Sequence, residues 1–397
     1  MKILFTMLEY NNESSNMYSD LAEEFINHNH AVTIITPANS AYPEGEYYEM
    51  KIKIIRANTP QSQGVSNLIK KGISLALMPH NFIRAYKRYL GQEHFDLIFM
   101  PTPPITLIDF VSYVKKRTKA KFYLILRDIH PQSAASIGLI KYKFMYDYLE
   151  HKAQKAYKLA NWIGCMSQGN IDFISNHYPF IDKSKLLLLQ NWQKKQTSLK
   201  DTQDIRGKYG LNNKILVLFG GNIGLGQKVE NIFSLMEHNR EKADILFLIV
   251  GKGIAKDRLL SLVREARLEN VRFFDFLPRD EYLRLIKSVD IGLISINEDY
   301  KVPTCPSKAV SYMSLGIPIL AMINPNNDYG DFIENAGAGY WAVASDKKKV
   351  FELFDKMCDN NELRKQISQN GYRYFCSYLT SESAYEILMR QINYGKA

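Results

Sequence analysis

The chain has few cysteines, no long apolar stretch and fewer acidic than basic residues. Its 397 residues include only four cysteines (Cys165, Cys305, Cys358 and Cys376), and no two of them form a CxxC pair. This scatter argues against a structural zinc site and favours a reducing compartment. No run approaches the roughly 18 apolar residues of a membrane-spanning helix. The N-terminal apolar run meets Glu9 too early for a signal peptide.

The charge balance points to anionic partners. There are 51 Lys and Arg residues against 41 Asp and Glu, a formal net charge of +10. Such an excess of positive charge attracts nucleic acid, anionic membranes or small molecules that carry phosphate. The cations are dispersed and no module of aromatic and basic residues recurs, so nucleic acid is not expected as a partner. A composition of 46% hydrophobic and 23% charged residues excludes a disordered chain.

Short apolar runs alternate with amphipathic stretches, which is typical of a parallel sheet covered by helices on both faces. In the first half we predict strands at 2–8, 31–36, 95–100, 121–126, 162–166 and 185–190, and helices at 17–28, 105–116, 142–159 and 169–177. In the second half we predict strands at 214–220, 243–250, 271–276, 290–296, 317–321 and 340–343, and helices at 228–237, 255–267, 279–288 and 307–315. Residues 347–393 have helical periodicity only.

This pattern predicts an α/β fold of two doubly wound, Rossmann-like domains that face a cleft, followed by a helical C-terminal tail. The expected boundaries are an N-terminal domain at 1–192, a polar linker at 193–204, a second domain at 205–378 and a C-terminal helix at 379–397 that packs back on the first domain. Ligands of open α/β sheets bind at the carboxyl ends of the strands. The candidate site residues should therefore lie in loops that follow strands.

A glycine-rich segment, residues 219–227, follows a predicted strand and leads into a predicted helix. Glycines let a backbone approach a ligand closely, and a helix N-terminus offers free N–H groups to a phosphate. The spacing is G-x-x-G-x-G, which matches neither a dinucleotide site nor a Walker loop. Gly221, Asn222, Gly224 and Lys228 are candidate anion-binding residues. The alternative is a plain tight turn.

A second candidate is the run Pro306-Ser307-Lys308 before a predicted helix. Proline suits the first helical position. A lysine in the first turn opposes the helix dipole, so it is more favourable beside a bound anion. The alternative is a solvated lysine whose stem packs on the turn. Glu298, at the end of a predicted strand, is a further candidate for holding a polar ligand.

The run Arg127-Asp128-Ile129-His130-Pro131-Gln132 gathers ionisable side chains at the end of a predicted strand. Arg127 could bind a phosphate, and Asp128 or His130 could orient or deprotonate a hydroxyl. The alternatives are a structural Arg127–Asp128 network and a solvated loop histidine.

Residues 66–90 form a basic and apolar stretch in which Pro79 should break or kink a helix. Such an element can lie among lipid headgroups. The alternative is an internal helix that packs on the sheet with its cations outward. The cations concerned are Lys70, Lys71, Arg84, Lys87 and Arg88.

These motifs resemble those of family 4 glycosyltransferases with the GT-B fold, and especially of the O-antigen and capsule fucosaminyltransferase-like subfamily. Residues 127–132 resemble its R-D-I-F-P-Q loop and residues 221–224 its G-N-I-G loop. Residues 306–308, followed by Tyr312-Met313, resemble its P-S-K-x-x-E-Y-M segment. The similarity extends over nearly the whole chain.

The resemblance implies a retaining transfer of a sugar, an N-acetylated amino sugar, from a UDP-sugar to a lipid-diphosphate-linked saccharide in capsule, O-antigen or exopolysaccharide synthesis. The UDP-sugar would be a co-substrate, with no cofactor and no metal. The protein would be cytoplasmic and peripheral on the inner face of the cell membrane. The implied catalytic residues are Asp128, His130 and Arg127, and the implied donor-binding residues are Gly221, Asn222, Gly224, Lys228, Leu277, Glu298, Ser307 and Lys308.

The chain departs from this family pattern at informative positions. Pro303 and Ser311 replace the paired glutamates of the E-x7-E motif, and Leu225 stands where the subfamily often has arginine. Two alternatives therefore stay open: a non-hydrolysing UDP-sugar 2-epimerase of the same fold, and an inactive subunit that binds nucleotide sugar.

Overall fold

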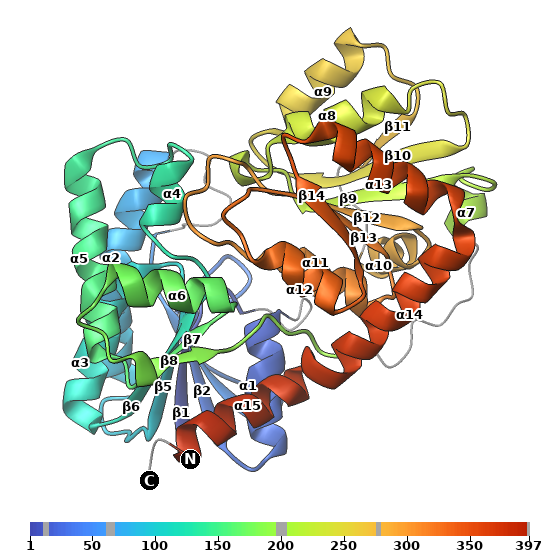
Figure 1. The fold of residues 1–397 in the computed structure, drawn as a ribbon. Helices are drawn as coiled ribbons and strands as arrows, with labels where there is room; N and C mark the ends of the chain where they lie inside the picture. The colour runs from blue at the N-terminus through green and yellow to red at the C-terminus, as the bar shows by residue number, and fades with distance from the viewer. Residues whose placement is uncertain (11–15, 61–67, 196–204, 275–278, 395–397) are drawn as a thin grey trace. The chain divides into compact units, whose positions relative to one another are not determined.

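The chain folds into two compact units. The computed structural model describes residues 1–10, 16–60, 68–195, 205–274 and 279–394. The N-terminal unit comprises Met1–Lys194 and Ser381–Ala397, and the C-terminal unit comprises Lys195–Thr380 (Figure 1). The two doubly wound α/β units and the helical C-terminal segment confirm the predicted fold class.

The N-terminal unit is built on an eight-stranded sheet in the order β3-β4-β2-β1-β5-β6-β7-β8. Every neighbouring pair is parallel except β3 and β4. The inner strands are buried on both faces, which explains their unbroken apolar runs. The strands are β1 (Lys2–Thr6), β2 (Ala31–Pro37), β3 (Gly45–Glu49), β4 (Ile52–Ala57), β5 (Leu97–Thr102), β6 (Lys121–Leu126), β7 (Trp162–Cys165) and β8 (Leu186–Leu188).

The hairpin β3–β4 was not among the predicted strands. Its turn places Met50 and Lys51 at positive φ angles of 45° and 66°. Turns of this kind favour Asn-Gly or Asp-Gly, so Met-Lys carries no turn signal in the sequence.

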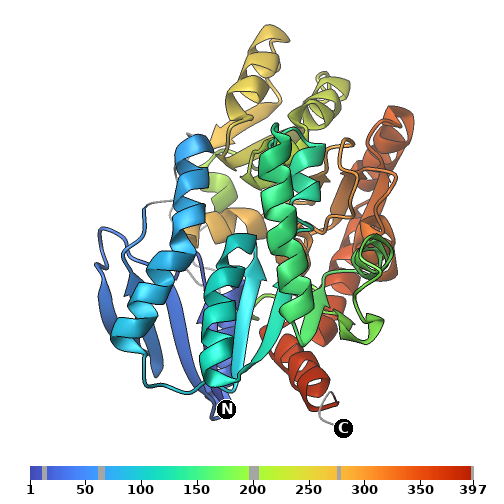
Figure 2. The ribbon, with the colours of Figure 1, turned by 90° about the vertical axis from the view of Figure 1, so that its left-hand side faces the viewer.

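Helices cover both faces of this sheet, and α2, α3 and α5 lie together on one side (Figure 2). The helix α2 continues through Pro79, so of the predicted break or kink the break does not occur. The last helix, α15, packs on α1, and the Tyr123 hydroxyl donates to Gln391 Oε1 at 2.6 Å. The helical segments are α1 (Met17–Asn27), α2 (Leu68–Tyr89), η1 (Ile105–Leu107), α3 (Ile108–Thr118), α4 (Gln132–Ser136), α5 (Lys143–Leu159), α6 (Gln168–His177), η2 (Lys183–Lys185) and α15 (Ser381–Tyr394).

The C-terminal unit has a six-stranded, wholly parallel sheet in the order β11-β10-β9-β12-β13-β14. The strands are β9 (Ile215–Asn222), β10 (Ile245–Lys252), β11 (Val271–Phe274), β12 (Ile291–Ser295), β13 (Ile319–Ile323) and β14 (Gly339–Val343). The helical segments are α7 (Ile205–Lys208), η3 (Leu225–Gln227), α8 (Val229–His238), α9 (Lys256–Glu265), α10 (Arg279–Lys287), α11 (Lys308–Ser314), α12 (Tyr329–Asn335), α13 (Lys347–Asp359) and α14 (Asn361–Tyr378). The strand order reverses between β9 and β12, where ligands of doubly wound sheets bind.

Candidate functional site

In the N-terminal unit, the loop after β6 begins with an arginine that faces inward. Arg127 is buried, and its Nη1 donates to the Leu189 carbonyl oxygen at 2.7 Å. Its guanidinium also lies over the Trp192 ring, 4.7 Å from the centroid. These contacts lie within the unit, so Arg127 stiffens the loop. They do not favour the predicted role as a phosphate ligand.

Asp128 and His130 follow on the same loop. Loss of water around the carboxyl group raises the pKa of Asp128 to about 6, although the residue as a whole is exposed. Burial lowers the pKa of His130 to about 4, so its imidazole is neutral at pH 7. The backbone N–H of His130 donates to the Asp128 carbonyl oxygen at 2.9 Å, which keeps the two residues adjacent. The pair can therefore offer a carboxylate and a neutral imidazole to a hydroxyl.

A hydrogen-bond network that the sequence analysis missed fixes the end of this loop. Gln132 Nε2 donates to Glu150 Oε2 at 2.8 Å and to the Tyr178 hydroxyl at 2.6 Å. The Tyr178 hydroxyl donates in turn to Glu150 Oε2 at 2.9 Å. Glu150 lies on α5 and Tyr178 directly follows α6. The side-chain amide of Gln132, on α4, therefore links α4 to α5 and to the end of α6. The only sequence signal was the glutamine that closes the 127–132 motif.

In the C-terminal unit, the glycine-rich segment differs from its predicted form. The strand β9 continues through Gly221 and Asn222, which pair with β10, and the short turn η3 follows. The helix α8 begins only at Val229, with Lys228 at its N-cap in a left-handed conformation, φ 41°. The segment therefore does not lead straight into a helix. Gly224 N donates to Gln227 Oε1 at 2.9 Å, so that amide is already used.

The loops after β9 and β12 are joined to each other. Lys228 Nζ lies 2.5 Å from Glu298 Oε2, which makes an ion pair of two predicted donor-binding residues. Asn297 strengthens the junction, because its backbone N–H donates to Gly226 O at 2.8 Å and its side-chain amide to Leu225 O at 3.1 Å. These contacts hold the two loops together at the point where the strand order of the sheet reverses.

Lys308 has the most unusual environment among the candidates. It is the first residue of α11, and no described residue accepts a hydrogen bond from its ammonium group. The ammonium lies 4.1 Å from the centroid of the Phe219 ring, and burial lowers the lysine pKa to about 8. A Cβ at Gly221 would lie 3.3 Å from Lys308 Cε, so the lysine runs directly past β9. It is not the solvated lysine of the alternative interpretation.

The remaining donor-binding candidates are Ser307 and Leu277. Ser307 is exposed, and its hydroxyl makes no capping bond to α11. Leu277 lies outside the described residues. The described part of the chain holds no group of three or more His, Cys, Asp or Glu side chains that could bind a metal ion.

The basic stretch forms α2, which has one buried and one exposed face. Met78, Phe82 and Tyr86 are buried, and the rings of Phe82 and Tyr86 lie 5.6 and 6.2 Å from that of Phe110 on α3. The exposed face carries Ile73 and Leu77 and then the cations Arg84, Lys87 and Arg88, with Lys70 near the start. The side chain of Lys71 is outside the described set.

Arg88 and Lys87 contact other parts of the fold. Arg88 Nη1 lies 3.4 Å from Glu44 Oε1, and Lys87 lies over the Tyr113 ring. The helix thus packs on the fold with its cations outward. No helix within the described ranges is long and apolar enough to cross a membrane.

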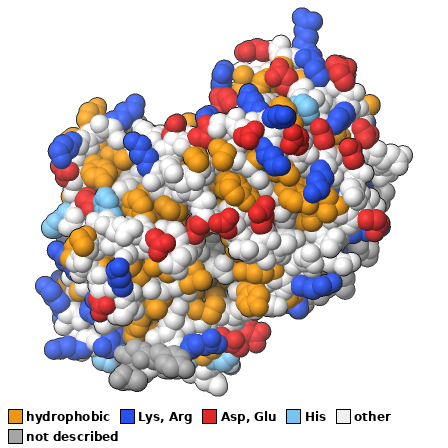
Figure 3. Space-filling view, in the orientation of Figure 1, with side chains coloured by type: hydrophobic (Ala, Val, Ile, Leu, Met, Phe, Trp, Pro, Cys, Tyr) orange, Lys and Arg blue, Asp and Glu red, His pale blue; other side chains and the backbone are white. Residues whose placement is uncertain are grey.

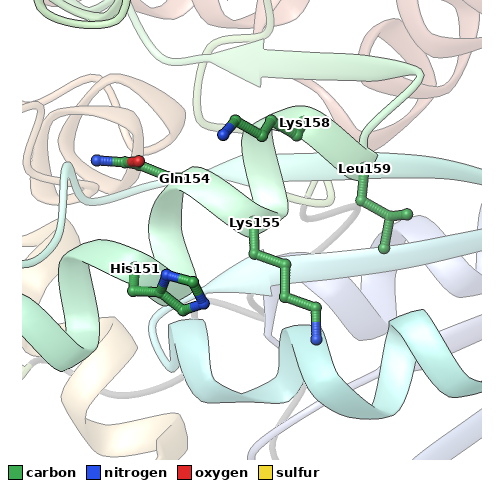
Figure 4. Close-up of a pocket in the computed structure, with 5 residues that line it drawn as sticks. All are labelled: His151, Gln154, Lys155, Lys158 and Leu159. Atoms are coloured by element: carbon green, nitrogen blue, oxygen red, sulfur yellow. The ribbon is translucent and has the colours of Figure 1, made fainter.

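A pocket of about 340 Å³ lies on α5, and no candidate site residue lines it. It is lined by His151, Gln154, Lys155, Lys158 and Leu159 (Figure 4). Lys155 Nζ contacts Asp109 Oδ1 at 2.7 Å, which offsets one of the positive charges there.

Known proteins to which this chain is similar are glycosyltransferases. Residues 201–374 match the model of the family "Glycosyl transferases group 1". A probable glycosyltransferase WbjE of Pseudomonas aeruginosa is 21% identical over 306 residues, 74% of this chain and 73% of that protein. A putative colanic acid biosynthesis glycosyl transferase WcaI of Escherichia coli K12 is 30% identical over 117 residues, 29% of this chain and 28% of that protein.

Solved structures agree on the fold. Sucrose-phosphate synthase of Thermosynechococcus elongatus superposes with a TM-score of 0.77 at 14% identity, over 99% of this chain and 98% of that one. Anabaena HepE, solved with UDP and glucose, gives a TM-score of 0.70 at 13% identity, over 99% and 100% of the two chains. The fold is that of the GT-B glycosyltransferases. The family model and the relatives support a group 1 glycosyltransferase.

Proposed function

We propose that this chain is a retaining glycosyltransferase that moves a sugar from a UDP-sugar to a lipid-diphosphate-linked saccharide during surface polysaccharide synthesis. The buried Lys308 ammonium at the reversal point of the C-terminal sheet carries the proposal. A buried cation without a hydrogen-bond acceptor is unfavourable unless an anion arrives beside it. The UDP bound to HepE and the colanic acid pathway in the name of WcaI support the donor and the product class.

The donor diphosphate would lie against the end of β9. Lys308 would donate to it, Ser307 would add a hydroxyl, and the exposed Gly221 and Asn222, which precede Gly224, would let it approach the backbone closely. The Lys228–Glu298 pair would hold the neighbouring loop in place.

In the reaction, the bond between the anomeric carbon of the sugar and the diphosphate oxygen breaks, and the acceptor oxygen forms a new bond to that carbon. The electron pair of the broken bond leaves with UDP, where Lys308 stabilises the charge. The acceptor hydroxyl would pass its proton to the departing diphosphate oxygen, so that the products are the glycosylated acceptor and UDP. Asp128 or His130 would orient that hydroxyl, and the inward-facing Arg127 would keep the loop rigid. An N-acetylated amino sugar, as in the fucosaminyltransferase-like subfamily, is the proposed transferred group.

The exposed face of α2 would attract an anionic membrane surface. Arg84, Lys87 and Arg88 lie on it, and a surface cation near anionic lipid contributes about 1 kcal/mol at low salt. This attachment would place the protein peripherally on the inner face of the cell membrane. Replacing the three cations by glutamine should release the protein from vesicles that contain phosphatidylglycerol. Unchanged binding at low salt would contradict the role of α2.

The transferase proposal is tested by thermal shift with UDP-, GDP- and dTDP-sugars, followed by a transfer assay on a lipid-linked acceptor. UDP-sugars should raise the melting temperature of the wild type and of Asp128→Asn, but not of Lys308→Ala. Asp128→Asn should bind donor and transfer little. If no nucleotide or nucleotide sugar stabilises the protein, the proposal fails.

One observation favours an inactive donor-binding subunit instead. Pro303 and Ser311 stand at the positions of the two E-x7-E carboxylates, so neither can contact the donor as a carboxylate. Donor binding without transfer, and polymer synthesis in cells that is unaffected by Asp128→Asn, would identify such a subunit. A change of free UDP-sugar without any acceptor would instead identify a 2-epimerase.

A further inference from the structure

A second surface of the N-terminal unit exposes apolar side chains that the fold leaves uncovered. Residues 138–148 join α4 to α5 and form the first turns of α5. Tyr142 is 62% exposed, Phe144 71% and Tyr148 44%. Leu139 and Met145 are also exposed. Figure 3 shows hydrophobic side chains gathered among Lys and Arg side chains over the beginning of α5. We call the five residues Leu139, Tyr142, Phe144, Met145 and Tyr148 the aromatic patch.

The packing of α5 does not account for this patch. The buried residues of the helix are Ala153, Ala156 and Tyr157, all in its second half. The exposed rings of Tyr142 and Phe144 instead stack on each other, with centroids 5.8 Å apart. Contiguous exposed apolar surface of this kind marks a contact with a partner or a membrane.

The composition of the patch favours a lipid surface. Tyrosine and phenylalanine beside lysine suit the headgroup region, because the rings enter the apolar layer while hydroxyl and ammonium groups stay in water. Residues 138–159 contain five lysines and two acidic residues. Lys143 pairs with Asp147 at 2.9 Å, and Lys152 and Lys155 pair with Asp109 on α3, so the remaining positive charge lies mainly at Lys141 and Lys158. A symmetric contact between two copies centred on the patch would bring the exposed Lys141 near its own equivalent, which disfavours a second copy as the occupant.

The patch also lies beside the candidate membrane helix. Both α2 and α5 contact η1, and both begin at the same end of the unit (Figures 1 and 2). Ile73 and Leu77 on the first half of α2 are 56% and 48% exposed. The sequence between Asp128 and the patch is only ten residues long, counted from 129 to 138. Seating the patch on a bilayer would therefore hold the acceptor-side loop close to the lipid surface.

We propose that the aromatic patch inserts into the headgroup region of an anionic bilayer, and that α2 supplies the accompanying electrostatic attraction. This inference rests on the proposed function for its biological purpose, because a lipid-linked acceptor requires access to a membrane. Insertion of the patch can be tested independently of that function. It can also be distinguished from the electrostatic attraction by α2, because insertion of apolar rings is much less sensitive to salt than attraction of cations.

The test uses Phe144→Trp in the full chain as a fluorescent reporter. The three native tryptophans are all at least partly buried, so the new indole is the most exposed one. With vesicles of phosphatidylcholine and phosphatidylglycerol, its emission should shift to the blue and keep that shift at high salt. Tyr142→Ser/Phe144→Ser should lower vesicle partitioning about tenfold or more, because two aromatic side chains no longer leave water.

The matched control is Tyr378→Ser, a tyrosine of the C-terminal unit that is 58% exposed. It should partition like the wild type, and all variants should keep the wild-type melting temperature because the replaced side chains are exposed. An unshifted Phe144→Trp emission, or unchanged partitioning of the double variant, would overturn the inference. A wild-type dimer that Phe144→Ser dissociates would also overturn it. If the protein inserts into vesicles but transfers no sugar, the proposed function is contradicted and the inference about the patch stands.

Discussion

The ammonium group of Lys308 lies 4.1 Å from the centroid of the Phe219 ring, and no described residue accepts a hydrogen bond from it. Phe219 belongs to β9 and Lys308 begins α11, so the contact joins the strand at the reversal point of the sheet to the helix that follows β12. The aromatic face offers the cation partial compensation for lost water. It leaves the hydrogen-bonding capacity of the ammonium for a ligand.

Donor binding should therefore depend on pH through Lys308. Burial lowers its pKa to about 8, so the side chain is mostly charged at pH 7 and mostly neutral one unit above that pKa. The affinity for UDP should fall as the pH rises through about 8, by at most about tenfold per pH unit. Lys308→Met should bind UDP at least about tenfold more weakly and without this dependence. Calorimetry of both proteins across the range checks this, and equal pH profiles would contradict it.

The same lysine should lower the stability of the ligand-free protein. Its pKa in the folded state, about 8, is below the ordinary value of 10.5, so the folded protein binds fewer protons than the unfolded chain between these values. The free energy of unfolding of the wild type should then rise with pH across this window. Lys308→Met, which never carries the buried charge, should melt higher than the wild type at pH 7. A lower melting temperature for the variant would show that the ammonium has a stabilising partner.

Glu150 and Tyr178 should act on catalysis through Gln132. Tyr178→Phe removes the hydroxyl that Gln132 and Glu150 share, which should cost about 1 kcal/mol of stability. If Asp128 and His130 serve the acceptor as proposed, the loosened loop should lower kcat roughly tenfold. Donor affinity should not change, because the donor candidates lie in the other unit. Steady-state kinetics and calorimetry separate the two effects.

Gln154→Ala is the matched control for that network. Gln154 donates to Glu150 Oε1 at 2.9 Å, the oxygen that does not meet Gln132. Its removal should leave kcat close to the wild-type value. An equal loss of kcat in the control, or a loss of donor affinity in Tyr178→Phe, would argue for a general structural role.

The sequence predicted both sheets well because their central strands are buried on both faces and appear as unbroken apolar runs. Prediction from the sequence failed where contacts between distant parts of the chain determine the local conformation. Met50 and Lys51 hold a left-handed turn that only the pairing of β3 with β4 imposes. The inward direction of Arg127 depends on Leu189 and Trp192, more than 60 residues away along the chain. Residue types at strand ends therefore identify candidate sites, but only the tertiary structure shows which side chains are already occupied.

The Lys228–Glu298 pair should restrain the lysine from binding the donor diphosphate. Glu298→Gln removes the carboxylate charge, so the Lys228 ammonium becomes available to the donor. The affinity for UDP should then rise a few-fold, because a partly exposed ion pair contributes at most about 1 kcal/mol. Lys228→Met/Glu298→Gln should lose that gain. Calorimetric titration of these proteins together with the single variant Lys228→Met completes the double-mutant cycle and measures the coupling. Weaker binding of UDP-sugar, but not of UDP, to Glu298→Gln would show that Glu298 contacts the sugar directly.

Gly251 should be required for the donor-side loop to form. It sits at φ +151° in β10, and a Cβ there would lie 1.9 Å from the Gly221 carbonyl oxygen, its partner in β9. Backbone would have to move, so Gly251→Ala should lower the free energy of unfolding by about 3–5 kcal/mol and weaken UDP binding. Gly72→Ala is the control, because nothing lies within 4 Å of its added methyl on α2 and it should add up to about 1 kcal/mol. A Gly251→Ala protein with wild-type melting temperature and UDP affinity would show that β9 and β10 are not so tightly paired at this point.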